Sequence, residues 1–401
     1  MSRAPLPLEE AQARVLALAS PTQGEETSIE GALGRYLAKP LLARRTQPAA
    51  DLSAMDGYAL APGDLAGPWQ VVGESSAGHP YAGVVHAGQA IRISTGALVP
   101  AGAGVVLCQE DTAREGDRLT LTGTPPQPEG RHIRRTGLDF RDGDEVLPAG
   151  TRVGPAQLAL AIAAGHGTLA VHRRPRLAIL DSGDELIAPG LPCPPHRLPA
   201  SNGAMLAAMT AALAGEIMRL GPVPDDLEAL DAALARAGDA DVIVTSGGAS
   251  VGDHDLIQPA LIRWGAQVDF WKVAIRPGKP LLVATRGSQI VIGLPGNPVS
   301  SLVTAHLFLL PLLRAMQGAR DPLPRRIVAR LTEDLGPGAD RREFIRGWWD
   351  GRDVMPRPMR DSSALAAVAA SNCLIEHDAM APAVAAGAEV IIQLLENGGS
   401  A

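Results

Sequence analysis

The spacing of hydrophobic positions divides the chain into segments of helical and strand-like character. Leu8, Ala11 and Val15 recur at helical spacing, which predicts an amphipathic opening helix. From about Asp51 to Arg135, short apolar runs such as WQVV and GVVLCQ are separated by Gly and Pro clusters. This alternation of runs and turn residues predicts a small β-rich domain.

Between Arg176 and Met316, strand-like runs alternate with helical ones. The runs RLAILD, DVIVTS and QIVIGL are separated by helical patterns at about 204–213, 256–264 and 299–316. Strands that are apolar throughout are typical of a mostly parallel sheet covered by helices on both faces. Short strands return after residue 317, in RIVARL, EFIRGWW and EVIIQLL, and predict a C-terminal β domain. We therefore expect a multidomain α/β plus β protein with a three-layer central domain.

Composition narrows the function classes. The chain has 36 Lys and Arg against 43 Asp and Glu, a net charge of −7, and only 3% aromatic residues. This balance argues against a nucleic-acid-binding face, which needs clustered positive charge and stacking rings. The three distant cysteines predict neither a disulfide framework nor a zinc site and favour a reducing cytoplasm. The most apolar stretch, Val299 to Leu313, is interrupted by polar residues and is expected to be too short for a membrane span.

Three of the expected strands end in loops suited to binding an anion. They run into Ser182-Gly183-Asp184-Glu185, into Gly247–Gly252, and into Pro295-Gly296-Asn297-Pro298. The carboxyl ends of parallel strands gather at one edge of a sheet, where glycines admit a ligand close to the backbone. One such loop is usually a plain turn, but three together predict a pocket for a phosphate-bearing ligand.

The same loops carry acidic residues. Asp184 and Glu185 lie in the first loop, Asp255 follows the second, and Asp225-Asp226 open the helix before the second strand. Carboxylates beside a phosphate predict a magnesium ion between them. The alternative for Asp225 and Asp226 is helix capping.

Two further patterns have competing interpretations. Arg276-Pro277-Gly278-Lys279-Pro280 places two cations around a rigid turn, which suits an oxyanion, although a solvated basic turn is equally compatible. The run Gly248–Gly252 matches a hydrolase nucleophile elbow with Ser250 as nucleophile and His306 or His377 as base. Two glycines already end the strand before Ser250, so the hydrolase interpretation is the weaker one. A Walker loop fails because Asp253-His254 stand where Lys and Ser or Thr are required.

Several motifs in order give the chain a family resemblance. They are DLSAMDGYA at residues 51–59, STGA at 94–97, TSGGASVG at 245–252, RPGKP at 276–280 and LPGNPVS at 294–300. With these motifs the chain resembles the molybdopterin molybdenumtransferase (MoeA) family, which is related to the gephyrin E domain. Their order and spacing agree over nearly the whole chain.

The resemblance implies a four-part subunit and an elongated homodimer. The parts would be a segmented linking domain (1–50 and 136–172), a β-rich domain (51–135), a molybdopterin-binding α/β domain (173–317) and a C-terminal β domain (318–401). The cleft would lie between the last two domains, and the β-rich domain of the partner subunit would bring Asp56 and Thr95 to it.

The resemblance also implies a reaction in which molybdenum from molybdate enters adenylated molybdopterin and AMP is released. Glu185, Asp226 and Asp255 would hold magnesium and, with Lys279 and Asp56, act in catalysis. Arg276, Lys279, Arg346 and Ser362 would bind molybdate. The other expected substrate-binding residues are Thr95, Asp139, Ser182, Gly183, Asp184, Asp225, Ser246, Gly247, Gly248, Ser250, Pro295, Gly296, Asn297 and Pro298. Transient contact with other cofactor-assembly proteins is a further expectation.

Three positions depart from the family pattern. Arg276 stands where the family usually has Lys, Ser182 where it has Thr, and Ala200 where it has Asp. The alternatives to an enzyme of cofactor assembly are a non-catalytic, gephyrin-like scaffold and a nucleotide pyrophosphatase on the same α/β domain.

Overall fold

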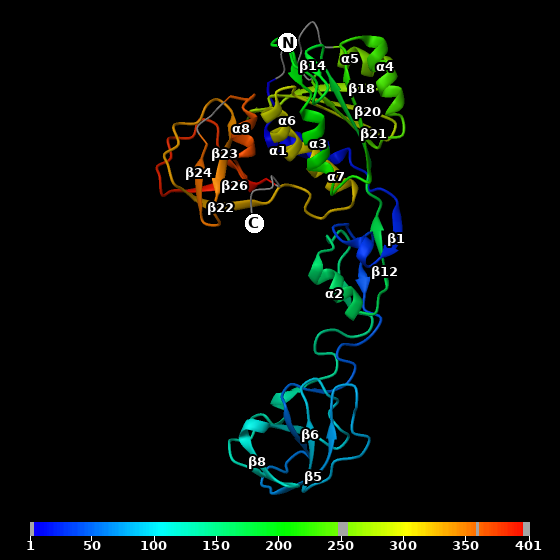
Figure 1. Ribbon diagram of the computed structural model, residues 1–401, viewed down its shortest axis with the longest axis vertical. Helices are drawn as coiled ribbons and strands as arrows, with labels where there is room; N and C mark the ends of the chain where they lie inside the picture. The colour runs from blue at the N-terminus through cyan, green and yellow to red at the C-terminus, as the bar shows by residue number, and fades with distance from the viewer. Residues whose placement is uncertain (1–3, 248–255, 358–360, 396–401) are drawn as a thin grey trace.

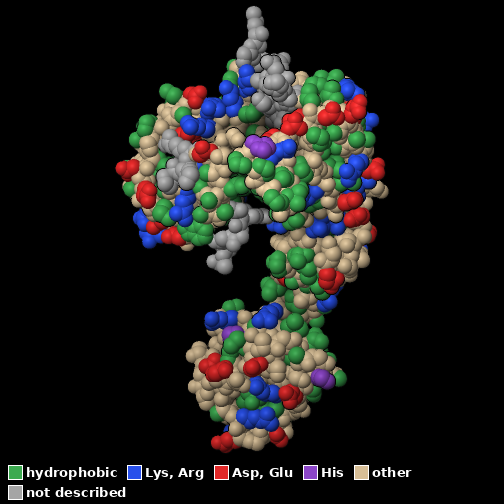
Figure 2. Space-filling model, turned by 45° about the horizontal axis from the view of Figure 1, so that its top comes forward, with side chains coloured by type: hydrophobic (Ala, Val, Ile, Leu, Met, Phe, Trp, Pro, Cys, Tyr) green, Lys and Arg blue, Asp and Glu red, His purple; other side chains and the backbone are tan. Residues whose placement is uncertain are grey.

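The computed structural model describes residues 4–247, 256–357 and 361–395. The molecule is elongated: the central α/β domain and the C-terminal β domain lie side by side at one end, and the β-rich domain lies at the other (Figure 1). Figure 2 shows the β-rich domain as a separate lobe on a narrow neck, and on the face drawn there acidic and basic side chains are interspersed. The predicted multidomain α/β plus β architecture is confirmed.

The central domain is built on a six-stranded sheet. Its strand order is β16 (Glu216–Val223), β13 (Arg176–Ser182), β17 (Val242–Ser246), β21 (Gln289–Leu294), β20 (Pro280–Arg286) and β18 (Gln267–Lys272). The first four strands are parallel, and β20 is antiparallel to both of its neighbours. The sheet is therefore mostly parallel, as its continuous apolar strands predict.

Helices cover both faces of this sheet. One face packs against α1 (Leu8–Ala17), α3 (Asn202–Thr210), α6 (Pro298–Thr304) and α7 (Leu310–Met316), and the other against α4 (Leu227–Arg236) and α5 (Ile257–Arg263). Alternate residues of β13 enter the two cores: Leu177 and Ile179 face α3, while Ala178 and Leu180 face α4. Helix α1 thus packs on the central domain. The predicted domain bounds, which follow chain order, place it in the linking segment instead.

The helix that follows β21 has the extent that its hydrophobic pattern predicts, to within one residue. From α6 it continues through a π-helical segment, η4 (Ala305–Leu309), into α7, so that Pro298–Met316 forms 19 helical residues. The π-helical segment ends two residues before Pro311, which has no N–H to continue the helical hydrogen bonds. The expectation that this stretch is too short to cross a membrane is wrong by length and composition. Its most apolar window is 89% buried inside the protein, which is typical of a core helix.

The β-rich domain is a second six-stranded sheet. Its order is β7 (Val105–Cys108), β4 (Gly57–Leu60), β6 (Gln89–Ile93), β5 (Trp69–Ser75), β9 (Arg118–Leu121) and β8 (Thr112–Glu115), with η2 (Gln109–Asp111) between β7 and β8. Gly57 begins β4 where a Cβ would lie 1.7 Å from the carbonyl oxygen of Leu107. Only glycine fits there, which explains the glycine that follows Asp56.

The linking segment pairs residues from both sides of the β-rich domain. Its strands are β1 (Gly24–Ser28) with β12 (Thr168–His172), and β2 (Leu41–Leu42) with β11 (Glu145–Leu147), beside α2 (Pro155–Ala163) and η1 (Glu30–Ala32). A further pair, β3 (Leu52–Ser53) with β10 (Ile133–Arg134), and η3 (Glu129–His132) lie where the chain enters and leaves the β-rich domain.

The C-terminal domain is a closed barrel. Its strands β23 (Arg342–Trp349), β24 (Asp353–Pro356), β22 (Arg326–Leu331), β26 (Glu389–Leu394) and β25 (Cys373–His377) pair in this order, and β25 pairs back to β23. A short strand of the central domain, β19 (Ile275–Arg276), pairs with β23 so that Arg276 lies opposite Glu343. This pairing, with α8 (Leu365–Ala369) against α6, fixes the barrel to the central domain.

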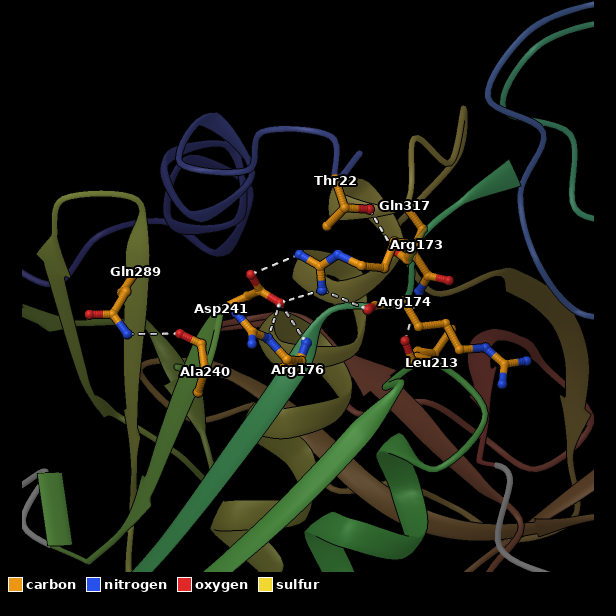
Figure 3. Close-up of polar contacts among 9 residues, drawn as sticks. All are labelled: Thr22, Arg173, Arg174, Arg176, Leu213, Ala240, Asp241, Gln289 and Gln317. Atoms are coloured by element: carbon orange, nitrogen blue, oxygen red, sulfur yellow. Dashed lines mark hydrogen bonds and ion pairs between the residues drawn. The ribbon is translucent and has the colours of Figure 1, made fainter. Parts of the chain in front are cut away.

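An ion-pair cluster fastens the linking segment to the central sheet (Figure 3). Both terminal nitrogens of Arg173 donate to Asp241, at 2.8 and 3.0 Å, and the backbone N–H of Arg176 donates to the same carboxylate at 2.6 Å. The side-chain hydroxyl of Thr22 donates to the carbonyl oxygen of Arg173. Burial alone would raise the pKa of Asp241, but these hydrogen bonds and positive charges lower it below its usual value of 3.8.

Replacing this acceptor should weaken the domain junction. Asp241→Asn is expected to lower the free energy of unfolding by about 1–3 kcal/mol, because Arg173 loses a charged acceptor. A lowered pKa stabilises the fold above pH 3.8, and this contribution is lost as the pH falls through the folded-state value. Denaturant unfolding at neutral pH and near pH 3 tests this, with the exposed Asp239→Asn as control. A difference from wild type that does not shrink in acid would contradict it.

Candidate functional site

The predicted loops meet in space. They line a cleft of about 770 Å³ at the carboxyl edge of the central sheet, between α3 and the barrel. Of the predicted residues, the cleft is lined by Ser182, Gly183, Glu185, Asp225, Ser246, Gly247, Pro295, Gly296, Asn297 and Pro298. Its other polar lining residues include Asp181, Ser201, Asn202 and Ser363. Gly248, Ser250 and Asp255 lie outside the described residues.

Side-chain amides hold the loops together. Nδ2 of Asn202, at the start of α3, donates to Ser246 Oγ at 2.8 Å and to the carbonyl oxygen of Gly296 at 2.7 Å. Nδ2 of Asn297 donates to Ser362 Oγ at 2.9 Å, across to the C-terminal domain. Two of the three loops and the barrel are thereby fixed relative to one another.

The glycines shape these loops differently from our expectation. The N–H of Gly183 donates to Val223 and that of Gly247 to Leu294, so neither amide is free for a phosphate. Gly247 has a φ of +99°, and a Cβ there would lie 2.8 Å from the carbonyl oxygen of Ser182. Gly247 is thus required by backbone conformation and close packing, and hydroxyls are the better phosphate donors here.

Acidic side chains gather at one wall of the cleft. The backbone N–H of Asp225 donates to Asp184 Oδ1 at 3.1 Å, and the N–H of Asp184 donates to Asp225 Oδ2 at 3.4 Å. Burial raises the pKa of Asp225; the Asp184 amide lowers it, and the charges of Asp184 and Glu185 raise it again. A cation near Asp225 would relieve this repulsion between like charges.

Asp226 has the capping role that we weighed as the alternative. Its Oδ1 accepts the N–H of Ala229 at 2.9 Å as the N-cap of α4, and the side chain does not line the cleft. Within the described part of the chain no three His, Cys, Asp or Glu side chains are grouped closely enough to hold a metal. Glu185 and Asp225 supply the oxygen donors that Mg²⁺ prefers, and Asp255, the remaining predicted ligand, lies outside the described ranges.

A second, basic pocket of about 350 Å³ adjoins the cleft between β19, α6 and β23. Arg276, Arg346, Ser362 and Arg357 line it, together with Ser300 in the first turn of α6. Arg346 is only 4% exposed, and its buried Nε has no hydrogen-bond partner in the described ranges. Burial lowers the pKa of Arg346, although a guanidinium remains charged at neutral pH.

Glu343 organises this basic pocket. The residue is 5% exposed, and its Oε1 lies 3.4 Å from Nη1 of Arg276. The two residues are partners in the pairing of β19 with β23. The pocket therefore combines three guanidinium groups with the hydroxyls of Ser300 and Ser362, and the acidic residues Glu343 and Asp361 also line it. Its excess of positive charge is suited to a tetrahedral dianion. Lys279 is exposed and lines neither pocket, although the adjacent Pro280 lines the cleft.

The remaining predicted residues lie away from the cleft in the same chain. Asp56 Oδ1 accepts the backbone N–H of Thr95 at 2.6 Å in the β-rich domain, and this hydrogen bond lowers the pKa of Asp56. Asp139 is exposed in the linking segment, where its N–H donates to Gln47. Asp56 and Thr95 thus lie together in the β-rich domain, which Figure 1 shows at the other end of the molecule from the central domain.

The histidines of the hydrolase alternative have partners elsewhere. His306 is buried, its Nε2 lies 2.9 Å from Gln393 Oε1, and burial lowers its pKa to about 4. His377 Nε2 lies 3.0 Å from the carbonyl oxygen of Gly336 in the barrel. Neither ring lines the cleft.

Sequence patterns missed several residues of the site, among them Asp181, Asn202 and Arg357. Asp181 ends an apolar run, and its pattern is that of any strand residue. Asn202 begins a helix, and Arg357 follows a short strand of the barrel. Their places depend on tertiary packing, and the only local signal was the polar residue at the end of RLAILD.

Comparisons with known proteins agree with this architecture. Three family models match consecutive parts of the chain: the MoeA N-terminal region (domain I and II) over residues 6–165, a probable molybdopterin binding domain over 178–315, and the MoeA C-terminal region (domain IV) over 328–395. The molybdopterin molybdenumtransferase of Haemophilus influenzae is 34% identical over 398 residues, covering 97% of this chain and 98% of the relative. That of Nostoc sp. is 36% identical over 335 residues, with 80% and 76% covered.

Solved structures agree as well. The crystal structure of the molybdopterin biosynthesis MoeA protein from Pyrococcus horikoshii OT3 superposes with a TM-score of 0.84 at 27% identity, covering 98% of this chain and 100% of that chain. Fold and site together define a multidomain enzyme with a molybdopterin-binding type of α/β domain. The chain belongs to the molybdopterin molybdenumtransferase (MoeA) family and is a transferase of molybdenum cofactor biosynthesis.

The contact between Asp181 and α3 gives a test of the geometry. A Cβ on Gly203 would lie 2.1 Å from Asp181 Oδ2, so Gly203→Ala is expected to lower the free energy of unfolding by about 1–3 kcal/mol. Gly336→Ala is the matched control, because a Cβ there meets nothing within 4 Å. Equal stability of the two variants in denaturant titrations would show that the cleft is not packed as described.

Proposed function

We propose that this protein transfers molybdenum from molybdate to adenylated molybdopterin and releases AMP. One observation carries the proposal: an acid-walled cleft shaped by glycine loops adjoins an arginine-lined pocket, and their linings meet at Ser362 and Ser363. Such a pair of sites can hold a pyrophosphate-linked substrate and a tetrahedral dianion next to each other. The chain's closeness to named molybdenumtransferases supports the same assignment.

In the cleft, side chains bind and orient the phosphoanhydride. Ser182 lines the cleft, and its hydroxyl can donate a hydrogen bond to a phosphate oxygen. Glu185 and Asp255, two of the three predicted ligands, would hold magnesium. Asp225, which lines the cleft, would take the place of the third predicted ligand, Asp226, which caps α4. Bound there, the ion would neutralise phosphate charge and favour attack by water on the anhydride.

In the basic pocket, Arg346, Arg276 and Ser362 would bind molybdate, and Arg357 would add a third cation. Arg346 is held in place by burial before any ligand arrives, so little side-chain entropy is lost on binding. Hydrolysis of the anhydride would proceed only once molybdate is bound, which avoids wasting the adenylated substrate.

The acting form would be a homodimer in the cytoplasm. Asp56 and Thr95 belong to the β-rich domain, which lies at the other end of the molecule from the central domain, and the elongated shape would let this domain reach the cleft of a partner copy (Figure 1). Transient contact with other cofactor-assembly proteins would deliver the substrate or take up the product.

The direct test incubates the purified protein with adenylated molybdopterin, magnesium and molybdate. AMP release and activation of an apo-molybdoenzyme are the expected results, and failure of both with competent substrate would end the proposal. AMP release without molybdate, from ordinary dinucleotides, would favour the pyrophosphatase.

Two variants distinguish metal binding from helix capping. Glu185→Gln is expected to lower AMP release about 100-fold or more, because a charged metal ligand is lost. Asp226→Asn keeps a good N-cap, and the Asp226 side chain does not line the cleft, so both its melting temperature and its AMP release should stay near those of wild type. Loss of AMP release at an unchanged melting temperature would instead make Asp226 a magnesium ligand. An Asp226→Asn variant with wild-type AMP release would leave Asp226 a capping residue only.

Subunit mixing tests the shared cleft. Asp56→Ala and Glu185→Ala should each be inactive alone, since each damages one side of every site. Random dimers of the two variants should regain about a quarter of wild-type AMP release, because half of the dimers are mixed and each has one intact site. No recovery after verified subunit exchange would place Asp56 outside the partner's cleft.

A further inference from the structure

Asp181 is a buried carboxylate at the floor of the cleft. It is only 5% exposed and lies next to last in β13, with its Oδ2 accepting the N–H of Gly203 at 3.0 Å. Asp181 lines the cleft, and its Oδ1 is also buried, with no hydrogen-bond partner among the residues that the structure describes. Burial raises the pKa of Asp181, and the Gly203 amide and the Ser246 hydroxyl act in the opposite direction.

Asn202 places a second unpaired acceptor in the same cleft. Its Nδ2 donates to the carbonyl oxygen of Gly296, which can only accept, so the orientation of the amide is fixed by its partners. Oδ1 of Asn202 is therefore the atom left over, and it is buried without a partner in the described ranges. The side chains of Asn202 and Asp181 both form hydrogen bonds with the side chain of Ser246, so their two unpaired oxygens belong to one cluster.

Two buried acceptors without donors are costly, at about 1–3 kcal/mol for each neutral group and more for a charged one. A ligand with N–H groups would satisfy them, whereas a phosphate would be repelled. Asp181 also occupies the N-terminus of α3 with its own carboxylate, so this helix end is closed to an anionic group. The floor of the cleft therefore selects the part of a ligand that carries N–H donors.

The surrounding walls are apolar. Leu186, Leu198, Leu256, Ile257 and Leu365 line the same cleft. A flat heterocycle packs well between such side chains, with its polar edge on the acceptors. The amino-pyrimidinone edge of a pterin presents two adjacent donors, the 2-amino group and the ring N3–H. The corresponding edge of adenine presents one amino group between ring nitrogens that are themselves acceptors.

We propose that Asp181 and Asn202 are specificity-determining residues that recognise the amino-pyrimidinone edge of the pterin. The inference rests on the proposed function in taking a pterin as the substrate. It assigns the pterin to the α3 side of the cleft floor and leaves the acidic wall and the basic pocket to the phosphates and the dianion.

The test compares two stable ligands without adenylate or metal. 6-Hydroxymethylpterin and 6-hydroxymethyllumazine differ at position 2, where lumazine has an oxygen in place of the amino group. Wild type should bind the pterin about tenfold or more tightly than the lumazine in fluorescence or calorimetric titrations, since the lumazine oxygen faces an acceptor. Equal binding of the two ligands by wild type would overturn the proposal.

Asp181→Asn gives the sharper readout. Its side-chain oxygen should accept the N–H of Gly203, so its NH₂ group faces the cleft and an acceptor becomes a donor. The preference for the pterin should disappear or reverse in favour of the lumazine. A purely structural role for Asp181 would weaken both ligands equally and contradict the proposal, and thermal melts confirm that the variant is folded.

AMP serves as the competing occupant. If AMP displaces the pterin and Asp181→Asn changes AMP affinity as much as pterin affinity, the floor recognises adenine and the proposal is wrong. The result of these binding tests can be distinguished from the result of the AMP-release test of the proposed function. Pterin preference without AMP release from the adenylated substrate would overturn only the reaction, and AMP release without pterin preference would overturn only the assignment of Asp181.

Discussion

Parallel pairing of β13, β17 and β21 is the constraint on which the rest of the site depends. Because their carboxyl ends lie at one edge, residues more than a hundred positions apart meet in one cleft. The register sets Asp181 opposite Ser246, so that the polar floor lies directly above the two apolar cores. Every residue of the site is placed relative to this edge, including Arg276, which β19 carries to the barrel.

Much of this arrangement follows from local patterns. Continuous apolar strands predicted the mostly parallel sheet, and glycine loops after three of them predicted the cleft. The glycines do not serve the predicted purpose of binding phosphate through their amides, because the N–H groups of Gly183 and Gly247 are already bonded to neighbouring strands. Asp181 was hidden because one polar residue at the end of an apolar run has no distinctive spacing. Its environment arises only when α3 packs on the sheet.

Other differences also come from contacts between distant segments. Arg357 reaches the basic pocket because β23 and β24 pair, which no local pattern indicates. Asp226 carries the acidic signal expected of a metal ligand, but the same residue type serves as an N-cap. Arg173, where the linking segment joins the central domain, pairs with Asp241 directly before β17, a contact between residues 68 positions apart.

The edge strand β16 of the central sheet is relevant to aggregation, not to binding. The barrel closes on itself, but the central sheet has two edge strands, β16 and β18, and among the described residues β16 pairs with a strand on one side only. Glu216 and Arg219 are exposed on this strand, and Pro222 removes one donor near its end. Charge and a missing N–H both oppose the addition of a foreign strand. The β16 edge of the sheet that forms the cleft is thereby protected against pairing with strands of other molecules.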